Sequence, residues 1–177
     1  MSENIELPDK KYQVIYADCP WRYDFSLDNS DKIENHYPTM SLEEIKALKV
    51  KDIADINCVL FMWATAPKLV EAIEVMESWG FKYKTCLIWD KELIGLGYWF
   101  RSQHELLLVG VKGKISPPEQ HKRISSVFKE KKGKHSKKPD TIRNFIADWY
   151  KDYSKIELFA RGRYEGWDVW GNEVDKV

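Results

Sequence analysis

Short, nearly continuous apolar runs recur along the chain of 177 residues, and polar or amphipathic segments separate them. Runs of this length are typical of strands that are buried on both faces of a sheet. Strands are predicted at 12–17, 56–63, 83–89, 105–111 and 155–159. The length fits one domain of roughly 100–200 residues. We therefore predict a single domain, residues 1–177, of the α/β class.

Amphipathic helices are predicted between several of these strands. Ser41 and Glu44 have the spacing of a capping box, which opens a short helix. Pro67 starts a second helix that Gly80 closes, and a third spans 139–150. Such alternation is typical of a mostly parallel sheet with helices on both faces, whose ligands bind beyond the carboxyl ends of the strands. The residues expected on the buried face of the second helix are Leu69, Val70, Ile73 and Met76.

The composition excludes several classes of protein. Hydrophobic residues make up 44% of the chain and charged residues 32%, which is the balance of a globular protein rather than a disordered or fibrous one. The longest apolar run, 58–64, is far shorter than the roughly 20 residues that span a membrane, and the first residues do not resemble a signal peptide. The cysteines and histidines show no metal-ligand or disulfide spacing. We therefore expect a cytoplasmic protein with no membrane association and no metal.

The positive charge is concentrated in one segment. Residues 112–138 contain ten Lys or Arg and two Glu, a net charge of +8, and the whole chain is neutral, so the remainder carries −8. A basic segment with Pro, Gly and Ser is typical of a loop that meets a polyanion through its phosphates. A loop that is merely solvated has the same composition. This segment is predicted to be a mobile basic loop, with both interpretations open.

The first chemical motif, Asp18-Cys19-Pro20-Trp21, stands where the first strand ends. The amino group of a nucleobase is a poor nucleophile, because its lone pair is delocalised into the ring. The Asp18 carboxylate and the Cys19 carbonyl can each accept one of its N–H groups, which favours a pyramidal nitrogen, while Trp21 stacks on the base. A turn with an Asp cap and a core Trp is the alternative. The following Arg22 and Tyr23 are candidate substrate contacts.

A second cluster of polar residues follows the last predicted strand. Glu157 and Arg161 lie at its end, and Asn172 and Glu173 follow a glycine-rich stretch. Donors and acceptors at a strand end can bind the hydroxyls of a ribose, and glycines let the backbone approach closely. There is no G-x-G-x-x-G phosphate loop. A C-terminal strand with two core Trp explains the pattern equally well.

Two further segments contain candidate binding residues. Lys138 stands directly before a predicted helix, where it can meet a carboxylate or a phosphate, although a surface lysine is the default interpretation. His104 and Glu105 begin a predicted strand after an aromatic loop, and they are either strand-entry residues or pocket groups. The 24 aromatic residues (eight Trp, nine Tyr and seven Phe) exceed what a small core needs, which predicts a stacking surface.

Taken together, these segments resemble the MT-A-seventy family of adenine N6-methyltransferases, which includes the catalytic subunit of the eukaryotic mRNA methylase and short bacterial and phage proteins. The motifs occur in family order over most of the chain. They are Asp-Cys-Pro-Trp at 18–21, Tyr-Pro-Thr-Met-Ser at 37–41, Leu-Phe-Met-Trp at 60–63, His-Glu-Leu-Leu-Leu-Val-Gly at 104–110, Lys-Pro-Asp at 138–140, Glu-Leu-Phe-Ala-Arg at 157–161 and Gly-Trp-Asp-Val-Trp-Gly-Asn-Glu at 166–173.

The resemblance implies a permuted Rossmann-like methyltransferase that uses S-adenosylmethionine and transfers a methyl group to the N6 amino group of adenine in nucleic acid, with DNA favoured over RNA. Residues 18–21 would hold the amino group, and Tyr37 would belong to a loop over the pocket. Lys138 would face the carboxylate of the methyl donor. Its ribose would meet Arg161, Asn172 and Glu173, with Glu157 nearby. This chain departs from the family at Cys19, which replaces a proline.

Other functions remain open from the sequence. The family contains degenerate subunits, so a non-catalytic nucleic-acid-binding partner is one alternative, although the retained Asp18, Pro20 and Trp21 argue against it. An RNA adenine methyltransferase and a small-molecule Rossmann domain are others. The expected partners are nucleic acid and, for a chain without a separate recognition domain, a second copy or a second methyltransferase-like subunit.

Overall fold

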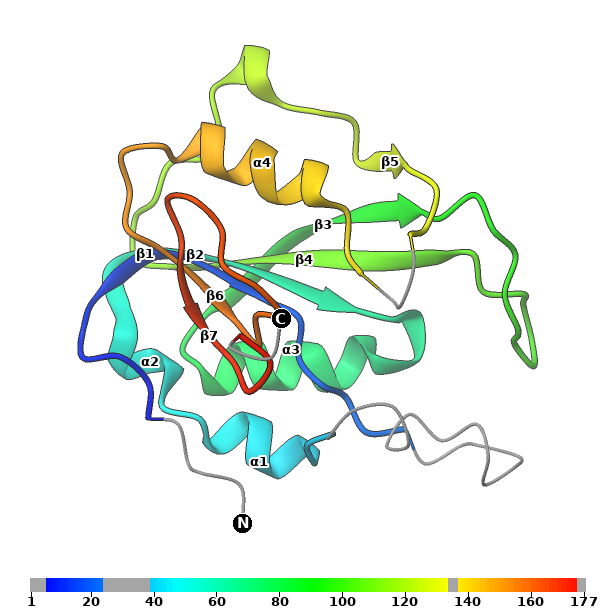
Figure 1. Ribbon diagram of the computed structural model, residues 1–177, viewed down its shortest axis with the longest axis horizontal. Coiled ribbons are helices and arrows are strands. Elements are labelled where there is room, and N and C mark those ends of the chain that lie inside the picture. The colour runs from blue at the N-terminus through cyan, green and yellow to red at the C-terminus, as the bar shows by residue number, and fades with distance from the viewer. Residues whose placement is uncertain (1–5, 24–38, 134–136, 175–177) are drawn as a thin grey trace.

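The computed structural model describes residues 6–23, 39–133 and 137–174. Within them, a seven-stranded sheet has the order β5-β3-β4-β2-β1-β6-β7 (Figure 1). The strands are β1 Tyr12–Ala17, β2 Ala54–Ala64, β3 Lys82–Asp90, β4 His104–Lys112, β5 Val127–Lys129, β6 Lys155–Leu158 and β7 Asp168–Trp170. Neighbouring strands are parallel except at β4, which is antiparallel to both β2 and β3. The prediction of an α/β fold with a mostly parallel sheet is confirmed.

The reversed strand β4 has a simple cause in the chain connection. Residues 91–103 join β3 to β4 without a helix. A parallel pair needs a crossover of a dozen or more residues, usually a helix, whereas a direct return along the neighbouring edge produces an antiparallel pair. The sheet is therefore mixed, and the connection 91–103 projects from its end.

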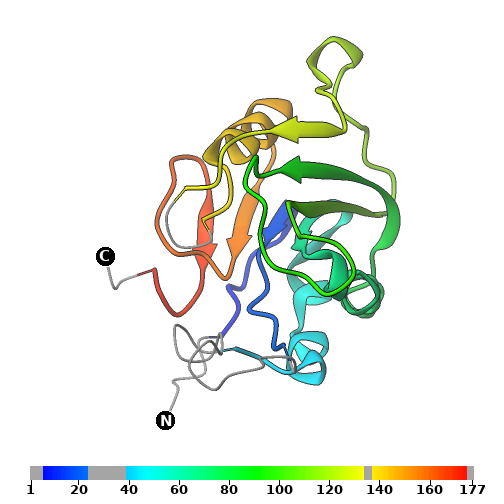
Figure 2. The same cartoon turned by 90° about the vertical axis from the view of Figure 1, so that its right-hand side faces the viewer.

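Helices cover both faces of the sheet, as predicted (Figures 1 and 2). Ile15 and Ala17 of β1 join an apolar cluster with residues of α1 Leu42–Ala47, α2 Val50–Ile53 and α3 Leu69–Ser78. Val14 and Tyr16 point to the other face and pack with residues of α4 Asp140–Trp149. Side chains alternate between the faces of a strand, so an almost wholly apolar strand fits a sheet with helices on both sides.

The helix boundaries follow local signals. The capping box is present at α1: the Ser41 hydroxyl accepts the Glu44 backbone N–H, and the Glu44 carboxylate accepts the Ser41 N–H. Pro67 lies in a 3₁₀ turn, Ala66–Lys68, just before α3, and Gly80 with φ 86° follows the helix. The predicted buried face of α3 is wrong at one position, because Val70 is exposed. The fully buried residues are Ala72, Val75 and Met76, with Trp79 just after the helix, and Leu69 and Ile73 pack against the same cluster while partly exposed.

The basic segment is more ordered than the predicted mobile loop. Its residues 112–133 include a 3₁₀ turn, Gln120–Lys122, and strand β5. The Trp149 indole N–H donates to the Lys122 carbonyl at 3.0 Å, and the Tyr150 hydroxyl donates to the Ser116 carbonyl at 3.1 Å. Ile115, Ile124 and Phe128 pack against the α4 side of the core. Apolar residues placed between the lysines therefore pack this segment against the core.

The strand register brings the predicted motifs to one edge of the sheet. Ala17 is paired with Met62 on one side and with Leu158 on the other, and Leu158 is paired with Trp170. The segments that follow β1, β2, β6 and β7 therefore leave the sheet together, next to the beginning of β4. No helix in the described part of the chain is long and apolar enough to span a membrane.

Candidate functional site

A cavity of about 370 Å³ lies at this edge of the sheet. Its volume is within the usual range for small-molecule sites. It collects most of the residues that the sequence singled out, including those from both ends of the chain. The predicted residues that line it are Asp18, Cys19, Pro20, Trp21, Tyr23, Glu105, Lys138, Arg161, Asn172 and Glu173.

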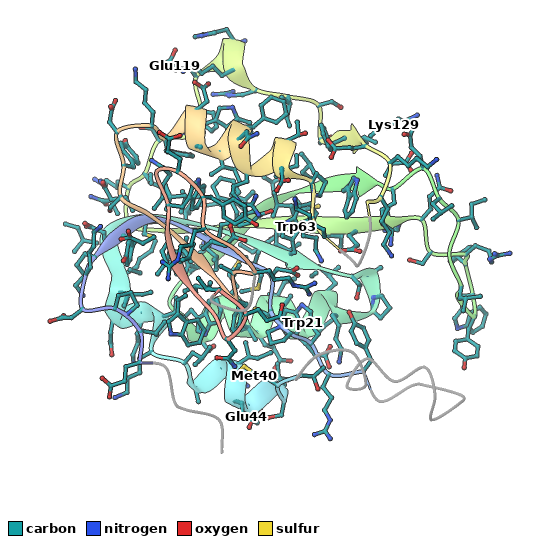
Figure 3. All side chains as sticks on the ribbon, in the orientation of Figure 1. Trp21, Met40, Glu44, Trp63, Glu119 and Lys129 are labelled. Atoms are coloured by element: carbon teal, nitrogen blue, oxygen red, sulfur yellow. The ribbon has the colours of Figure 1, made fainter. Side chains whose placement is uncertain are left out.

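The segment after β1 is fixed in place at one end of the cavity. The Pro20 carbonyl accepts the Met40 backbone N–H at 2.9 Å, and a bridge pairs Trp21 with Met40. The Trp21 indole N–H donates to the Trp63 carbonyl at 3.3 Å. These three side chains come from different segments and all line the cavity (Figure 3). Asp18 and Cys19 are consequently held between strand β1 on one side and the anchored Pro20 and Trp21 on the other.

Cys19 contributes a backbone group rather than a reactive thiol. The residue is buried, and burial raises the pKa of its thiol, which the nearby Asp18 carboxylate raises further. A protonated, buried thiol is a poor nucleophile. Its carbonyl accepts the Trp21 N–H at 2.9 Å, and a carbonyl oxygen has two lone pairs, so one remains for a second donor.

Lys138 joins two carboxylates across the cavity. Its ammonium lies 3.0 Å from Asp18 Oδ2 and 3.1 Å from Glu105 Oε2, and all three side chains are largely shielded from solvent. Burial alone lowers the pKa of Lys138, but the two negative charges outweigh that effect and raise the pKa above its ordinary value. The ammonium also lies 5.9 Å from the centre of the Trp63 ring. Lys138 is therefore a charged centre of the site and not a surface lysine.

Glu105 is held from a second direction. Lys91, at the end of β3, places its ammonium 3.4 Å from Glu105 Oε1. The two carboxylate oxygens of Glu105 thus meet two different cations. The sequence offered two interpretations of Glu105, a strand-entry residue or a pocket group. Both describe it, because Glu105 is the second residue of β4 and also lines the cavity.

Polar groups also line the cavity after β6 and β7. Arg161 Nε lies 3.5 Å from Glu173 Oε2, and Asn172 stands beside them in sequence. Phe159 and Trp170 supply aromatic surface there, with ring centres 5.3 Å apart and planes at 71°. This part of the cavity therefore combines flat apolar surface with hydrogen-bonding groups.

Two backbone features build this part of the cavity. Phe159 has φ 60°, a left-handed conformation that is uncommon for a non-glycine residue and often occurs at functional sites. A side chain at Gly171 would place its Cβ 2.6 Å from the Ala160 carbonyl oxygen and 2.7 Å from the Ala160 nitrogen. Glycine is therefore required where the segment after β7 crosses the segment after β6.

Three predicted residues lie outside the cavity lining. Glu157 is buried on the α4 side, where its carboxylate accepts hydrogen bonds from Arg143 at 2.6 and 3.2 Å. Burial raises the pKa of Glu157 and outweighs the opposite effect of Arg143. Arg22 is exposed, and His104 pairs with Asp90 in the β3–β4 ladder. Tyr37 lies outside the described residues.

The cavity also contains residues that the sequence did not assign to the site. Trp63 belongs to the 60–63 motif, and its position at the end of a strand was the available signal. Met40 follows Tyr37 in another motif. Phe159 and Trp170 looked like core aromatics, because nothing in a sequence marks a left-handed residue or the crossing of two segments. Among the described residues, no group of three His, Cys, Asp or Glu side chains is arranged to hold a metal.

In α/β proteins with an open sheet, small molecules bind in a cavity beyond the carboxyl ends of the strands. The fold and the cavity of this protein define that class. Comparison with known proteins narrows the class. The MT-A70 (MT-A-seventy) family model matches residues 12–173. The chain belongs to the MT-A70 family.

Relatives come from bacteria and eukaryotes. The chain is 40% identical over 187 residues to the type II methyltransferase M.MunI of Mycoplasma sp, covering 96% of this chain and 80% of that protein. It is 31% identical over 193 residues to the human N(6)-adenine-specific methyltransferase METTL4 and 28% identical over 177 residues to the human N(6)-adenosine-methyltransferase catalytic subunit METTL3. Each match covers 94% of this chain, but it covers only 38% of METTL4 and 29% of METTL3.

Proposed function

We propose that this protein is an S-adenosylmethionine-dependent adenine N6-methyltransferase that acts on DNA. The observation that carries the proposal is the pair of acceptors at one end of the cavity, the Asp18 carboxylate and the Cys19 carbonyl, beside Trp21. The printed names of the relatives supply the atom and the polymer. METTL4 and METTL3 are named for N6 of adenine and adenosine, and M.MunI, a type II methyltransferase, has the highest identity of the three and is matched over 80% of its length.

The order of the elements supports a permuted Rossmann-like methyltransferase fold. The segment proposed to bind the target amine follows β1, the first strand of the chain. The segment proposed to bind the methyl donor follows β6 and β7, the last two strands. Both segments leave the same edge of the sheet, so the permutation does not separate the two halves of the site.

The residues of the cavity fit S-adenosylmethionine. Arg161, Asn172 and Glu173 would meet the ribose hydroxyls, and Phe159 with Trp170 offers aromatic surface for the donor's adenine ring. Lys138 would face the donor carboxylate, since its ammonium is charged and reaches the cavity wall. When bound, this cofactor supplies an electrophilic methyl group. The chain's own residues then have to hold and orient the amine.

Asp18 and Cys19 would activate the amine without removing its proton beforehand. Each would accept one N–H, which would favour a pyramidal nitrogen whose lone pair is free to attack an electrophilic methyl group. As the N–C bond forms, the bond from that methyl group to the donor's sulfur would break, the neutral thioether would leave, and the surplus N–H proton would pass along the hydrogen bond to the Asp18 carboxylate. The Lys138 ammonium lies 3.0 Å from Asp18 Oδ2 and helps to hold that side chain in place. Positioning and electrostatics would supply most of the rate. The buried, protonated Cys19 thiol takes no part.

The test is transfer of labelled methyl from S-adenosylmethionine to single-stranded DNA, duplex DNA and RNA, followed by nucleoside analysis. Label in N6-methyldeoxyadenosine, abolished in Asp18→Asn, supports the proposal. Asp52→Asn on the exposed surface of α2 is the matched control and should keep the activity. Label only in RNA would contradict the assignment to DNA. Binding of nucleic acid without transfer to any polymer would favour a non-catalytic subunit.

We place the reaction in the cytoplasm, together with the nucleic acid substrate. The three cysteines, all in the described part of the chain, are free thiols in this structure. Such usage is typical of a reducing compartment.

A further inference from the structure

The connection between β3 and β4 carries a cluster of exposed aromatic side chains. Tyr98, Trp99 and Phe100, which we call the aromatic tip, expose 76%, 91% and 88% of their surface. Contiguous exposed apolar surface of this kind marks interaction sites. None of the three residues lines the cavity, and the proposed mechanism uses none of them.

The backbone holds the aromatic tip in a closed turn. The Gly95 N–H donates to the Ser102 carbonyl at 2.7 Å, and the Ser102 N–H donates to the Leu96 carbonyl at 3.1 Å. The Arg101 guanidinium donates to the Gly95 carbonyl at 2.6 Å. A side chain at Gly97 would place its Cβ 2.0 Å from the Phe100 carbonyl oxygen. The turn therefore needs glycine where its two arms meet, and it presents the aromatic rings outward.

The same connection forms part of the cavity wall. Ser102 and Glu105 line the cavity, so the arm that returns from the aromatic tip passes the proposed target site. At the base of the turn, the Lys91 N–H donates to the Gln103 carbonyl at 2.9 Å. Figure 1 shows the connection reaching beyond the end of the sheet. If a base of the ligand enters the cavity, the part of the ligand next to that base would contact the aromatic tip.

Positive charge surrounds the base of this turn. Strand β5 pairs with β3 up to Lys129, opposite Asp90, and the Lys132 N–H then donates to the Lys91 carbonyl at 3.2 Å. The labelled Lys129 lies at the same end of the sheet as the β3–β4 connection (Figure 3). In this region five cations face four anions; the cations are Lys91, Arg101, Lys129, Lys131 and Lys132, and the anions are Asp90, Glu92, Glu130 and Glu105, which pairs with Lys91. Aromatic rings beside lysines favour a nucleic acid over an apolar protein surface.

We propose that the aromatic tip is a stacking wedge that enters duplex DNA beside the target adenine and stabilises the duplex from which that adenine has been flipped. This inference rests on the proposed function. A base inside a duplex cannot reach a cavity unless it leaves the stack, and inserted apolar side chains can take part in unstacking a base step. The lysines around the base of the turn then contact the phosphates on either side.

The test compares Trp99→Ala and Trp99→Phe with the parent protein on three substrates of the same sequence. These are an intact duplex, the duplex with an abasic site opposite the target adenine, and the single strand. Trp99→Ala should lower kcat/KM on the intact duplex by about tenfold, which is the scale of one lost base-stacking contact. The loss should be smaller opposite the abasic site and smallest on the single strand, because unstacking there costs less.

Two variants provide controls. Trp99→Phe should recover most of the activity on the intact duplex, since a phenyl ring still stacks. Val70→Ala removes another exposed apolar side chain, on α3, and should match the parent on all three substrates. A loss in Trp99→Ala that is equal on all three substrates, or no loss at all, would overturn the wedge while leaving the proposed function intact.

The inference and the proposed function can fail separately. If no polymer is methylated, the proposed function fails, and the wedge is tested by the affinity for a fluorescent 30-base-pair duplex of random sequence. Weaker binding by Trp99→Ala than by Val70→Ala would then support the wedge, and equal binding would contradict it. Sedimentation supplies the last check. A dimer of the parent protein that Trp99→Ala dissociates, with unchanged DNA affinity, would overturn the wedge in favour of a protein interface.

Discussion

At the scale of single residues, the site depends on three charged side chains that satisfy one another. Lys138 lies between Asp18 and Glu105 at 3.0 and 3.1 Å, largely out of water. Two carboxylates so close to one another would be costly without the shared cation. The role proposed for Cys19 uses only its carbonyl, so it does not depend on the chemistry of the thiol.

The raised pKa of Lys138 predicts how activity depends on pH. A lysine whose folded-state pKa lies above the ordinary 10.5 keeps its charge below that value and loses it only as the pH rises through the higher folded pKa. Lys138→Gln should therefore reduce methyl transfer by the same factor at pH 7.5 and at pH 9.5, measured against the parent protein at each pH. A loss that shrinks at pH 9.5 would mean that Lys138 is already deprotonating.

At the scale of elements, α4 is tied to the last strands by a buried ion pair. Arg143 donates twice to Glu157 of β6, and its guanidinium lies 3.5 Å from the centre of the Tyr164 ring. This contact fixes the strand that leads to Phe159 and Arg161. Glu157 therefore helps to hold the end of β6 in place, although it does not line the cavity itself.

Removing one partner of this ion pair should lower the free energy of unfolding. Arg143→Met leaves Glu157 buried without its cation, and such a break typically costs about 3–5 kcal/mol of unfolding free energy. Urea denaturation followed by circular dichroism measures the change. The double variant Arg143→Met with Glu157→Leu removes both charges and should recover a large part of the loss. A single variant as stable as the parent would show that the pair contributes little.

The crossing at Gly171 makes a second prediction for these elements. Gly171→Ala forces a Cβ against the Ala160 backbone, so we expect a loss of about 1–3 kcal/mol in stability and weaker binding of S-adenosylmethionine, as Asn172 and Glu173 shift. Calorimetric titration and thermal unfolding measure the two effects. Gly133→Ala is the matched control, because a Cβ there meets nothing within 4 Å. Equal behaviour of the two variants would contradict the proposed role of the crossing.

The sequence predicted the long elements better than the short ones. β1 has the predicted bounds, and the helix opened by Ser41 has its capping box. The three-residue strands β5 and β7 were missed because so few residues carry no detectable pattern. The direction of β4 was also missed, since apolar runs do not record direction and only the length and content of the 91–103 connection decide it.

The sequence predicted where the candidate site lies, but it did not predict which side chains contact one another there. Residues next to strand ends, such as Asp18 and Arg161, could be placed because the carboxyl ends of parallel strands share an edge. The partner of Glu157 could not be predicted, because Arg143 lies on a helix whose rotation the sequence does not fix precisely. Likewise, no pattern distinguishes an aromatic residue that lines a cavity, such as Phe159, from one in the core.

At the scale of the whole molecule, the charge is uneven although the chain is neutral. The net charge of +8 between residues 112 and 138 lies partly beside the edge that carries the cavity. The amino ends of the parallel strands, including the residues before β6, lie at the opposite edge. We expect the lysines beside the cavity, Lys129 among them, to contact a polyanion that approaches this edge.

This asymmetry predicts a local salt dependence. Lys129→Gln and Lys131→Gln should each weaken DNA binding and reduce the slope of log affinity against log salt by about 0.9 per lost phosphate contact. Lys151→Gln, exposed before the amino end of β6, is the control and should leave the slope unchanged. Fluorescence anisotropy at several salt concentrations measures all three. Equal slopes for all variants would contradict an oriented approach.

The measurement that tests the account most directly is a kinetic comparison of variants at Asp18, the proposed amine contact, and at Glu173, the proposed donor contact. Asp18→Asn should lower kcat about 10²–10³-fold, the loss expected for one electrostatic group that acts on the reacting nitrogen, with little change in KM for S-adenosylmethionine. Glu173→Gln should instead raise KM for S-adenosylmethionine while largely preserving kcat. The reverse pattern, with Asp18→Asn affecting only donor binding or Glu173→Gln affecting only kcat, would contradict the assignment of the target amine to Asp18 and of the methyl donor to Glu173.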